Sequence, residues 1–295
     1  MRCPAFAALS MLVAPRVSIN DMHGFSLCST SATGVHVSSW DPAASHSTTS
    51  NFEIMYVSGL ENSGLGIVQW LPDLEKMRVP IKALWTDASV DMTYARVRDF
   101  LGDYDLSRTV VVAESFGCLP VLHNNVSPGG VLVNPPLGLP GTRTEALMRE
   151  FLDSGGTQAL RELKTIVSAN APSVRDIMDT VNRMVTHDHA ALAVGVLGAL
   201  LHNWATVMGR NETARASTLC RMLLDGYEEV DPCHRDASRW TVLLSLDDTL
   251  IPSLHGLREF NAARKLVITA PHAVSASQFD MHAALTVALR SHINI

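Results

Sequence analysis

Hydrophobic residues in this 295-residue chain follow two patterns, short continuous runs and longer stretches with helical spacing. Continuous runs rich in Val, Ile and Leu that are bounded by turn residues are typical of buried strands. We expect strands at Glu53–Gly59, Arg78–Trp85, Thr109–Val112, Gly130–Pro136, Arg239–Leu246 and Lys265–Thr269. Helical spacing occupies residues 67–77, 92–101 and 278–293. Strands that alternate with helices predict an α/β fold, a doubly wound and mostly parallel sheet with helices on both faces.

Residues 141–235 lack the strand pattern and carry helical spacing instead. The expected helical segments are 145–152, 158–167, 174–185, 190–204 and 214–227. An all-helical insertion between strands of such a sheet is most simply a cap over the active site, whose apolar faces line a pocket or pack on one another. We therefore predict a core formed by residues 53–140 and 236–295, with a helical cap at 141–235.

The first 52 residues differ in composition from the rest of the chain. They are rich in Ser and Thr, contain Arg2 and Arg16 and lack Glu, which is typical of an organelle transit peptide. The apolar run Ala5–Ala14 leaves a secretory signal open, and Gly34–Trp40 alternates as an early strand would. We expect a targeting or flexible segment at 1–52 and a plastid or other organelle location, with a cytoplasmic or secreted location as the alternative.

Composition and charge exclude several classes of protein. Hydrophobic residues make up 47% of the chain and charged residues 18%, which excludes a disordered protein. The net charge of −6, without a basic cluster, argues against a nucleic-acid partner. The five cysteines are scattered, and His187 and His189 have no third ligand candidate nearby, so we expect no metal and no cofactor. No apolar run reaches the roughly 18 residues of a membrane span.

The strand at Thr109–Val112 ends in the sequence AESFG, a variant of the G-x-S-x-G nucleophile elbow. A serine becomes a nucleophile when a sharp strand-to-helix turn presents its hydroxyl to a base and to oxyanion donors. Such a turn needs small residues two positions before and after the serine, and Ala113 and Gly117 meet this requirement. We predict Ser115 as the nucleophile and the backbone N–H of Phe116 as one oxyanion donor.

The C-terminal part of the chain supplies candidates for an acid and a base. The acids Asp247 and Asp248 follow one predicted strand, and His272 follows the next. Because ligands of such sheets bind at the carboxyl ends of the strands, these residues are expected near Ser115. His282 lies inside the terminal helical pattern and is a weaker candidate than the loop residue His272. The chain order of Ser, Asp and His is that of α/β-hydrolases.

Four ordered motifs resemble those of the α/β-hydrolase superfamily, and more narrowly the plant and algal esterase, lipase and thioesterase group that includes the phytyl ester synthases. The motifs are SGLENSGLGI at Ser58–Ile67, AESFGC at the elbow, VNPP after the next strand and DTLIPS at Asp248–Ser253. The resemblance covers residues 53–139 and 239–295. The chain departs from the family pattern at Ala113, Cys118, Pro120 and Pro271, and Pro120 predicts that the helix after the elbow starts late or kinks.

The resemblance implies an α/β-hydrolase fold with Asp248 as the acid and the N–H of Leu60 as the second oxyanion donor. It implies a serine ester hydrolase that forms an acyl-enzyme. Because the predicted cap offers apolar surface and little charge, we expect a lipidic ester as the substrate, with peripheral membrane or lipid-droplet association. An acyltransferase that moves fatty acyl groups to phytol or diacylglycerol would use the same residues. The elbow departures leave a non-catalytic binding protein as the alternative of another class.

Overall fold

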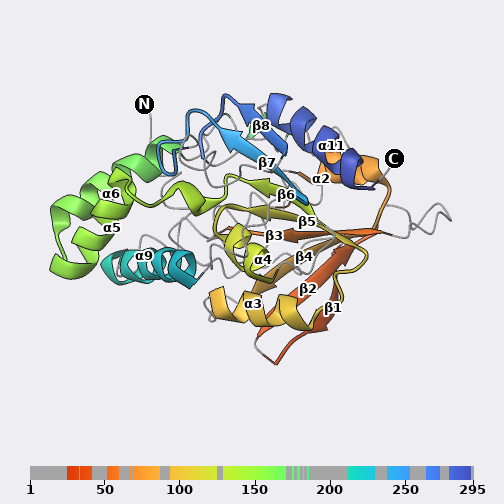
Figure 1. The fold of residues 1–295 in the computed structure, drawn as a ribbon, viewed down its shortest axis with the longest axis horizontal. Helices are drawn as coiled ribbons and strands as arrows, with labels where there is room; N and C mark the ends of the chain where they lie inside the picture. Colours follow the sequence, from red (N-terminus) through yellow and green to blue (C-terminus); the bar gives the residue numbers. More distant parts are fainter. Residues whose placement is uncertain are drawn as a thin grey trace.

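The computed structural model describes residues 25–32, 34–41, 52–59, 67, 70–86, 94–124, 129–170, 175, 178–179, 182, 185, 212–229, 238–252, 264–272 and 279–293. Within them, eight strands form one sheet in the order β1-β2-β4-β3-β5-β6-β7-β8 (Figure 1). The strands are β1 Ser26–Thr30, β2 Val35–Trp40, β3 Glu53–Val57, β4 Ile81–Thr86, β5 Thr109–Glu114, β6 Gly130–Val133, β7 Trp240–Ser245 and β8 Arg264–Ile268. The pairs β1–β2 and β2–β4 are antiparallel, and every other pair is parallel.

Helices cover both faces of this sheet, as the alternating pattern predicts. The helices described over their full length are α2 Leu71–Leu74, α3 Tyr94–Asp103, α4 Cys118–Asn124, α5 Arg143–Ser154, α6 Thr157–Asn170, α9 Glu212–Glu229 and α11 Phe279–Ile293. Short 3₁₀ turns lie at Glu75–Met77, Ser115–Gly117 and Pro136–Gly138. Side chains of β5 alternate between the two faces, so Val111 packs with the side of α3 and α4 and Val112 with the side of α2 and α11.

Local backbone chemistry sets where two of the predicted strands begin and end. The strand expected from Arg78 begins only at Ile81, because Arg78 adopts a left-handed conformation that ends the preceding turn and Pro80 lacks an N–H. The strand expected to run to Pro136 ends at Val133. Asn134 has a φ of 46°, and such a backbone cannot continue a strand.

The N-terminal prediction requires a correction, because β1 and β2 lie within the region assigned to a targeting or flexible segment. Val35 and Val37 are fully buried, and β2 pairs with β4 from Val35 to Trp40. The early strand considered for Gly34–Trp40 is thus present, whereas the strand at Ser26–Thr30 gave no apolar signal since all five of its residues are exposed. The sheet therefore includes residues 26–40, and no structure is described for residues 1–24.

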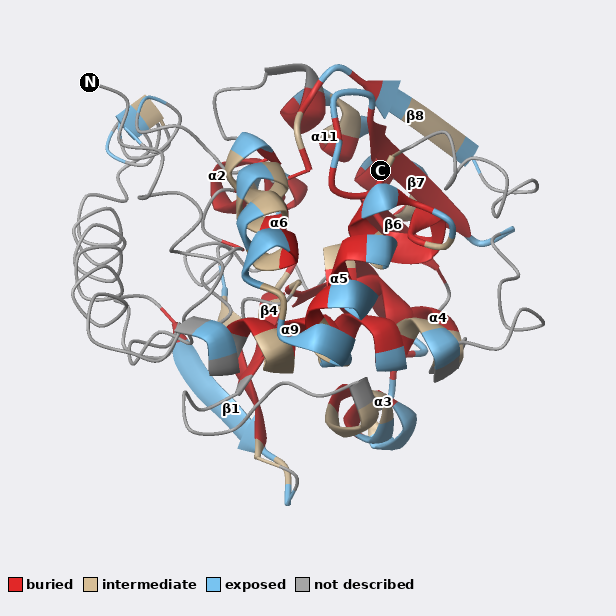
Figure 2. Ribbon diagram, turned by 90° about the vertical axis from the view of Figure 1, so that its left-hand side faces the viewer, coloured by how far each residue is buried: buried red, intermediate tan, exposed pale blue. Residues whose placement is uncertain are grey.

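The helices of the predicted cap group beside one end of the sheet (Figure 1). Figure 2 shows α5, α6 and α9 with buried inner faces and exposed outer faces. Their inner residues Phe151, Leu163 and Leu223 join the same apolar cluster as the α3 side of the sheet. The helix predicted at 190–204 lies outside the described residues, as does most of the helix predicted at 174–185.

Candidate active site

Ser115 lies at the junction between β5 and the 3₁₀ turn that leads into α4. Its φ is 50°, a left-handed conformation that a non-glycine residue adopts at a cost of roughly 1–3 kcal/mol. Glu114, immediately before it, is still in the extended conformation of the strand. The backbone therefore reverses direction at the serine, as the elbow motif predicts.

Close packing against β3 explains why small residues flank the serine. A Cβ at Gly117 would lie 2.3 Å from the carbonyl oxygen of Ser58 and 2.6 Å from that of Val57, so only glycine is tolerated there. A Cβ at Gly59 would lie 3.1 Å from the Cβ of Ser115, which is also tighter than usual. The turn is thus held by direct contact between the elbow and the end of β3.

The structure accommodates two of the departures from the family motif. Cys118 is fully buried, and the single proton of its thiol can be donated to the carbonyl oxygen of Ala113, at 3.3 Å, or to that of Val133, at 3.7 Å. Burial raises the pKa of the Cys118 thiol well above its ordinary value, and the negative charge of Glu114 adds to this effect. Pro120 lies in the first turn of α4, where an N–H has no partner within the helix, and α4 starts late, at Cys118, as predicted.

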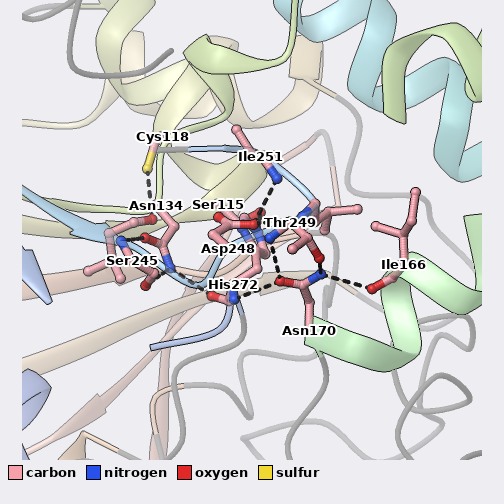
Figure 3. Close-up of polar contacts among 12 residues, drawn as sticks. Ser115, Cys118, Asn134, Ile166, Asn170, Ser245, Asp248, Thr249, Ile251 and His272 are labelled. Carbon is pink, nitrogen blue, oxygen red and sulfur yellow. Dashed lines mark hydrogen bonds and ion pairs between the residues drawn. The ribbon is translucent and has the colours of Figure 1, made fainter. Parts of the chain in front are cut away.

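The structure brings Ser115, Asp248 and His272 together (Figure 3). The Ser115 Oγ lies 2.8 Å from the His272 Nε2, and the His272 Nδ1 lies 2.6 Å from the Asp248 Oδ2. Asp248 and His272 are both buried. Asp247, the neighbouring candidate, is exposed, and His282 bonds elsewhere, to Asp73 on α2. When a hydroxyl, an imidazole and a carboxylate are hydrogen-bonded in this spatial order, the imidazole can accept the proton of the hydroxyl.

Asp248 is fixed by its own loop. Its Oδ1 accepts the backbone N–H groups of Leu250 at 2.9 Å and Ile251 at 2.7 Å, while Oδ2 faces His272. Hydrogen bonds from backbone N–H groups to an aspartate two or three residues earlier are typical of a tight turn. Both carboxylate oxygens are engaged, so the carboxylate is oriented before any substrate arrives.

The charge of Asp248 favours the protonated form of His272. Burial alone would lower the pKa of His272, but the nearby Asp248 carboxylate and its hydrogen bond outweigh burial and raise the pKa above its ordinary value of 6.5. The more distant charge of Glu114 acts in the same direction. The site therefore stabilises an imidazolium, which is the state that forms when the imidazole accepts a proton.

Two buried asparagines that were not among the predicted site residues complete the polar network around His272. Asn134, at the end of β6, donates its amide to the His272 carbonyl oxygen at 2.7 Å and to the Ser245 Oγ at 2.8 Å, and it accepts the Ser245 N–H. Asn170, the last residue of α6, accepts the backbone N–H of His272 at 3.1 Å. The VNPP motif pointed to the neighbourhood of Asn134, and no sequence signal marked Asn170.

Of the two predicted oxyanion donors, the structure describes Phe116 and not Leu60. Phe116 is buried in the 3₁₀ turn directly after Ser115, which is the position from which its N–H would meet an oxyanion. Leu60 lies outside the described residues, so its donor role stays a prediction. His187 and His189 also lie outside them.

The described residues contain no group of three or more His, Cys, Asp or Glu that could hold a metal ion. Among the helices described here, none has both the length and the apolar character needed to cross a membrane.

Comparison with known proteins identifies the fold. No family model and no curated protein matches this sequence. Among solved structures, an α/β hydrolase enzyme from a Medee basin deep-sea metagenome library matches with a TM-score of 0.56 at 11% identity, over 92% of this chain and 98% of that one. An esterase from Pyrococcus furiosus matches with a TM-score of 0.52 at 13% identity, over 95% and 97% of the two chains. A haloalkane dehalogenase loop variant from Bradyrhizobium elkanii matches with a TM-score of 0.53 at 12% identity, over 91% and 97%.

The protein has an α/β-hydrolase fold, as the sequence predicted. The mostly parallel sheet, the flanking helices and the structural matches agree on this point. At identities of 11–13% the matches establish the fold.

Proposed function

We propose that the protein is a serine ester hydrolase that acts through an acyl-enzyme. The observation that carries the proposal is the continuous hydrogen-bonded series from Asp248 through His272 to Ser115, with the serine on a strained left-handed turn. This arrangement meets the geometric requirement for an activated serine, a base within hydrogen-bond reach and a third group that orients the base.

His272 accepts the proton of Ser115 as the hydroxyl attacks the ester carbonyl, and Asp248 stabilises the resulting imidazolium. The N–H groups of Phe116 and Leu60 bind the oxyanion of the tetrahedral intermediate. His272 then donates its proton to the leaving alcohol, and the acyl group stays on the serine. Water, activated by His272 in the same way, releases the acid and restores the free enzyme.

The substrate we propose is a lipidic acyl ester. The apolar inner faces of α5, α6 and α9 and the resemblance of four motifs to the phytyl ester synthase group support this choice. Peripheral association with a membrane or lipid droplet and an organelle location, the plastid first, complete the proposal. The structural match named as an esterase is consistent with ester hydrolysis in general.

A fluorophosphonate probe tests the proposal directly, because it reacts with an activated serine and not with an ordinary, unactivated serine. We expect wild-type protein to be labelled at Ser115 and to hydrolyse p-nitrophenyl esters, with a preference among acyl chain lengths. Ser115→Ala should lose both the labelling and the hydrolysis, and Ser107→Ala, at an exposed serine before β5, serves as the matched control.

Equal rates for wild type and Ser115→Ala would remove Ser115 from its role. Folded wild-type protein that takes no label would favour a binding protein. A long-chain alcohol added to the assay distinguishes water from an alcohol as acyl acceptor by the product formed.

A further inference from the structure

Asn170 is a residue of the cap whose side chain reaches into the candidate active site. It is the last residue of α6 and is fully buried, whereas Ala169 before it is exposed. Figure 3 shows its amide between the loop that carries Asp248 and the loop that carries His272. The cap therefore contacts the two loops through a buried polar group as well as through apolar packing.

Every hydrogen-bonding position of this amide is engaged. The Asn170 Oδ1 accepts the backbone N–H groups of Thr249 and His272, each at 3.1 Å. The Nδ2 donates to the Thr249 Oγ1 at 2.7 Å and to the carbonyl oxygen of Ile166 at 2.8 Å. An amide has two acceptor sites and two donor protons, so the network around it is complete. A complete buried network specifies one arrangement of the groups that it joins.

The two loops held by Asn170 carry the acid and the base of the proposed reaction. Thr249 directly follows Asp248 in the chain, and the other partner is the backbone of His272 itself. The opposite end of the His272 residue, its carbonyl oxygen, is held by Asn134 from the core. His272 is therefore fixed at its N–H by the cap and at its carbonyl by the sheet.

We propose that Asn170 is a positioning residue that couples the cap to the acid and base loops of the active site. The inference rests on the proposed function, since it concerns the alignment of the same triad. The imidazole must stay within hydrogen-bond reach of both Ser115 and Asp248, and a misplacement of about 1 Å can cost on the order of 100-fold in rate. Because Asn170 ends α6, a shift of that helix moves the amide oxygen that accepts the backbone N–H of His272.

Kinetics of three variants test this proposal. Asn170→Ala removes all four contacts, and we expect kcat and the rate constant for fluorophosphonate labelling to fall together by about 10- to 100-fold while KM changes little. Asn170→Asp keeps oxygens for the N–H groups of Thr249 and His272 but loses both donors, so its kcat should lie between those of wild type and Asn170→Ala. Asn182→Ala, at an exposed asparagine of a cap helix, should leave kcat and KM unchanged and is the matched control.

Thr249→Val provides a milder test if Asn170→Ala does not fold. It removes only the hydroxyl that accepts from the Asn170 Nδ2 and should reduce kcat less than Asn170→Ala does. In the double variant the two losses should be less than additive, because both substitutions break the same contact.

Folded Asn170→Ala with wild-type kcat would overturn the proposal, and so would an effect confined to KM. Equal losses in Asn170→Ala and Asn170→Asp would show that the backbone contacts do not matter. These results differ from a failure of the proposed function, in which wild-type protein itself takes no label at Ser115.

Discussion

The described part of the chain contains two buried Asp–His pairs, and one of the two lies beside a serine. In the first, the His272 Nδ1 is 2.6 Å from the Asp248 Oδ2, and in the second the His282 Nδ1 is 2.5 Å from the Asp73 Oδ2. All four side chains are at most 5% exposed. By distance and burial alone the two pairs are nearly indistinguishable.

The pairs differ in what surrounds them. The Nε2 of His272 faces the hydroxyl of Ser115, whereas the Nε2 of His282 is buried and has no hydrogen-bond partner among the described residues. His282 lies within α11, and its ring is 5.0 Å from that of Trp70 on the α2 side of the sheet. His272 follows β8 at the edge where the strands end.

The second carboxylate oxygen also distinguishes the pairs. The Asp248 Oδ1 accepts two backbone N–H groups, while the Asp73 Oδ1 binds the side chain of Lys76 at 2.8 Å. Burial alone would raise the pKa of Asp73, but hydrogen bonds from His282 and Lys76 outweigh it and hold the pKa well below its usual range. An Asp–His pair can therefore join two helices, and the serine on the elbow is what distinguishes the pair of the proposed active site.

The largest expected effect separates the two carboxylates by activity. Asp248→Asn should lower kcat by about 10⁴-fold, because the amide cannot stabilise the imidazolium or hold the reactive tautomer of His272. Asp73→Asn should leave kcat within a few-fold of wild type, since Asp73 touches neither Ser115 nor His272. The kcat of each variant is measured by steady-state ester hydrolysis at a temperature where both variants are folded. Similar losses in the two variants would contradict the distinction.

The next effect separates the pairs by stability. His282→Leu leaves the buried Asp73 carboxylate with Lys76 as its charged partner and should lower the free energy of unfolding by about 3 kcal/mol. His292→Leu, on the same helix, removes one hydrogen bond to Thr241 and should cost about 1 kcal/mol. Urea unfolding measures both. If the two variants lose the same stability, the Asp73–His282 pair does not fasten α11 to α2.

The smallest effect is a difference in pH dependence. His272 must be neutral to accept a proton, so kcat/KM should fall as the pH drops through an apparent pKa above 6.5. Because the pKa of His272 is raised in the folded protein, this residue stabilises the fold at pH values below its pKa in the unfolded chain. This stability is lost as the pH rises through the pKa of the folded state. Asp73 has a depressed pKa, so its contribution is present above about pH 4 and is lost only as the pH falls through its folded pKa. Activity should therefore disappear at pH values where the folded protein persists.

Glu114→Gln sharpens the same pH measurement. The Tyr56 hydroxyl donates to the Glu114 Oε2 at 2.7 Å, and a glutamine oxygen can accept this bond without the charge. Since the Glu114 charge raises the pKa of His272, the variant should move the acidic limb of kcat/KM to lower pH. Glu53→Gln, which alters a carboxylate on β3 that accepts from Tyr104, should leave that limb in place. A limb that moves in both variants would assign the shift to stability instead of charge.

Much of the site could be predicted because its signals are local. Ser115, Asp248 and His272 each lie within four residues after the end of a strand, and the carboxyl ends of parallel strands meet at one edge of the sheet. The His272 backbone and Asn170 are 102 positions apart and meet through a side-chain-to-backbone bond, which leaves no periodic trace. Asp73 and His282 meet across 209 positions, and the helical pattern around His282 predicted only that it would not reach the serine.

The hairpin of β1 and β2 limits where the chain can be shortened without loss of part of its sheet. A protease that cut near residue 52, where the Ser- and Thr-rich composition ends, would remove the strand that pairs with β4 and expose the residues around Val35 and Val37 to water. Phe25 is buried as well, with its ring 5.3 Å from that of Trp40. A cut that leaves the sheet intact therefore lies before Phe25, and a polypeptide shortened in this way retains the hairpin as an integral edge of its sheet.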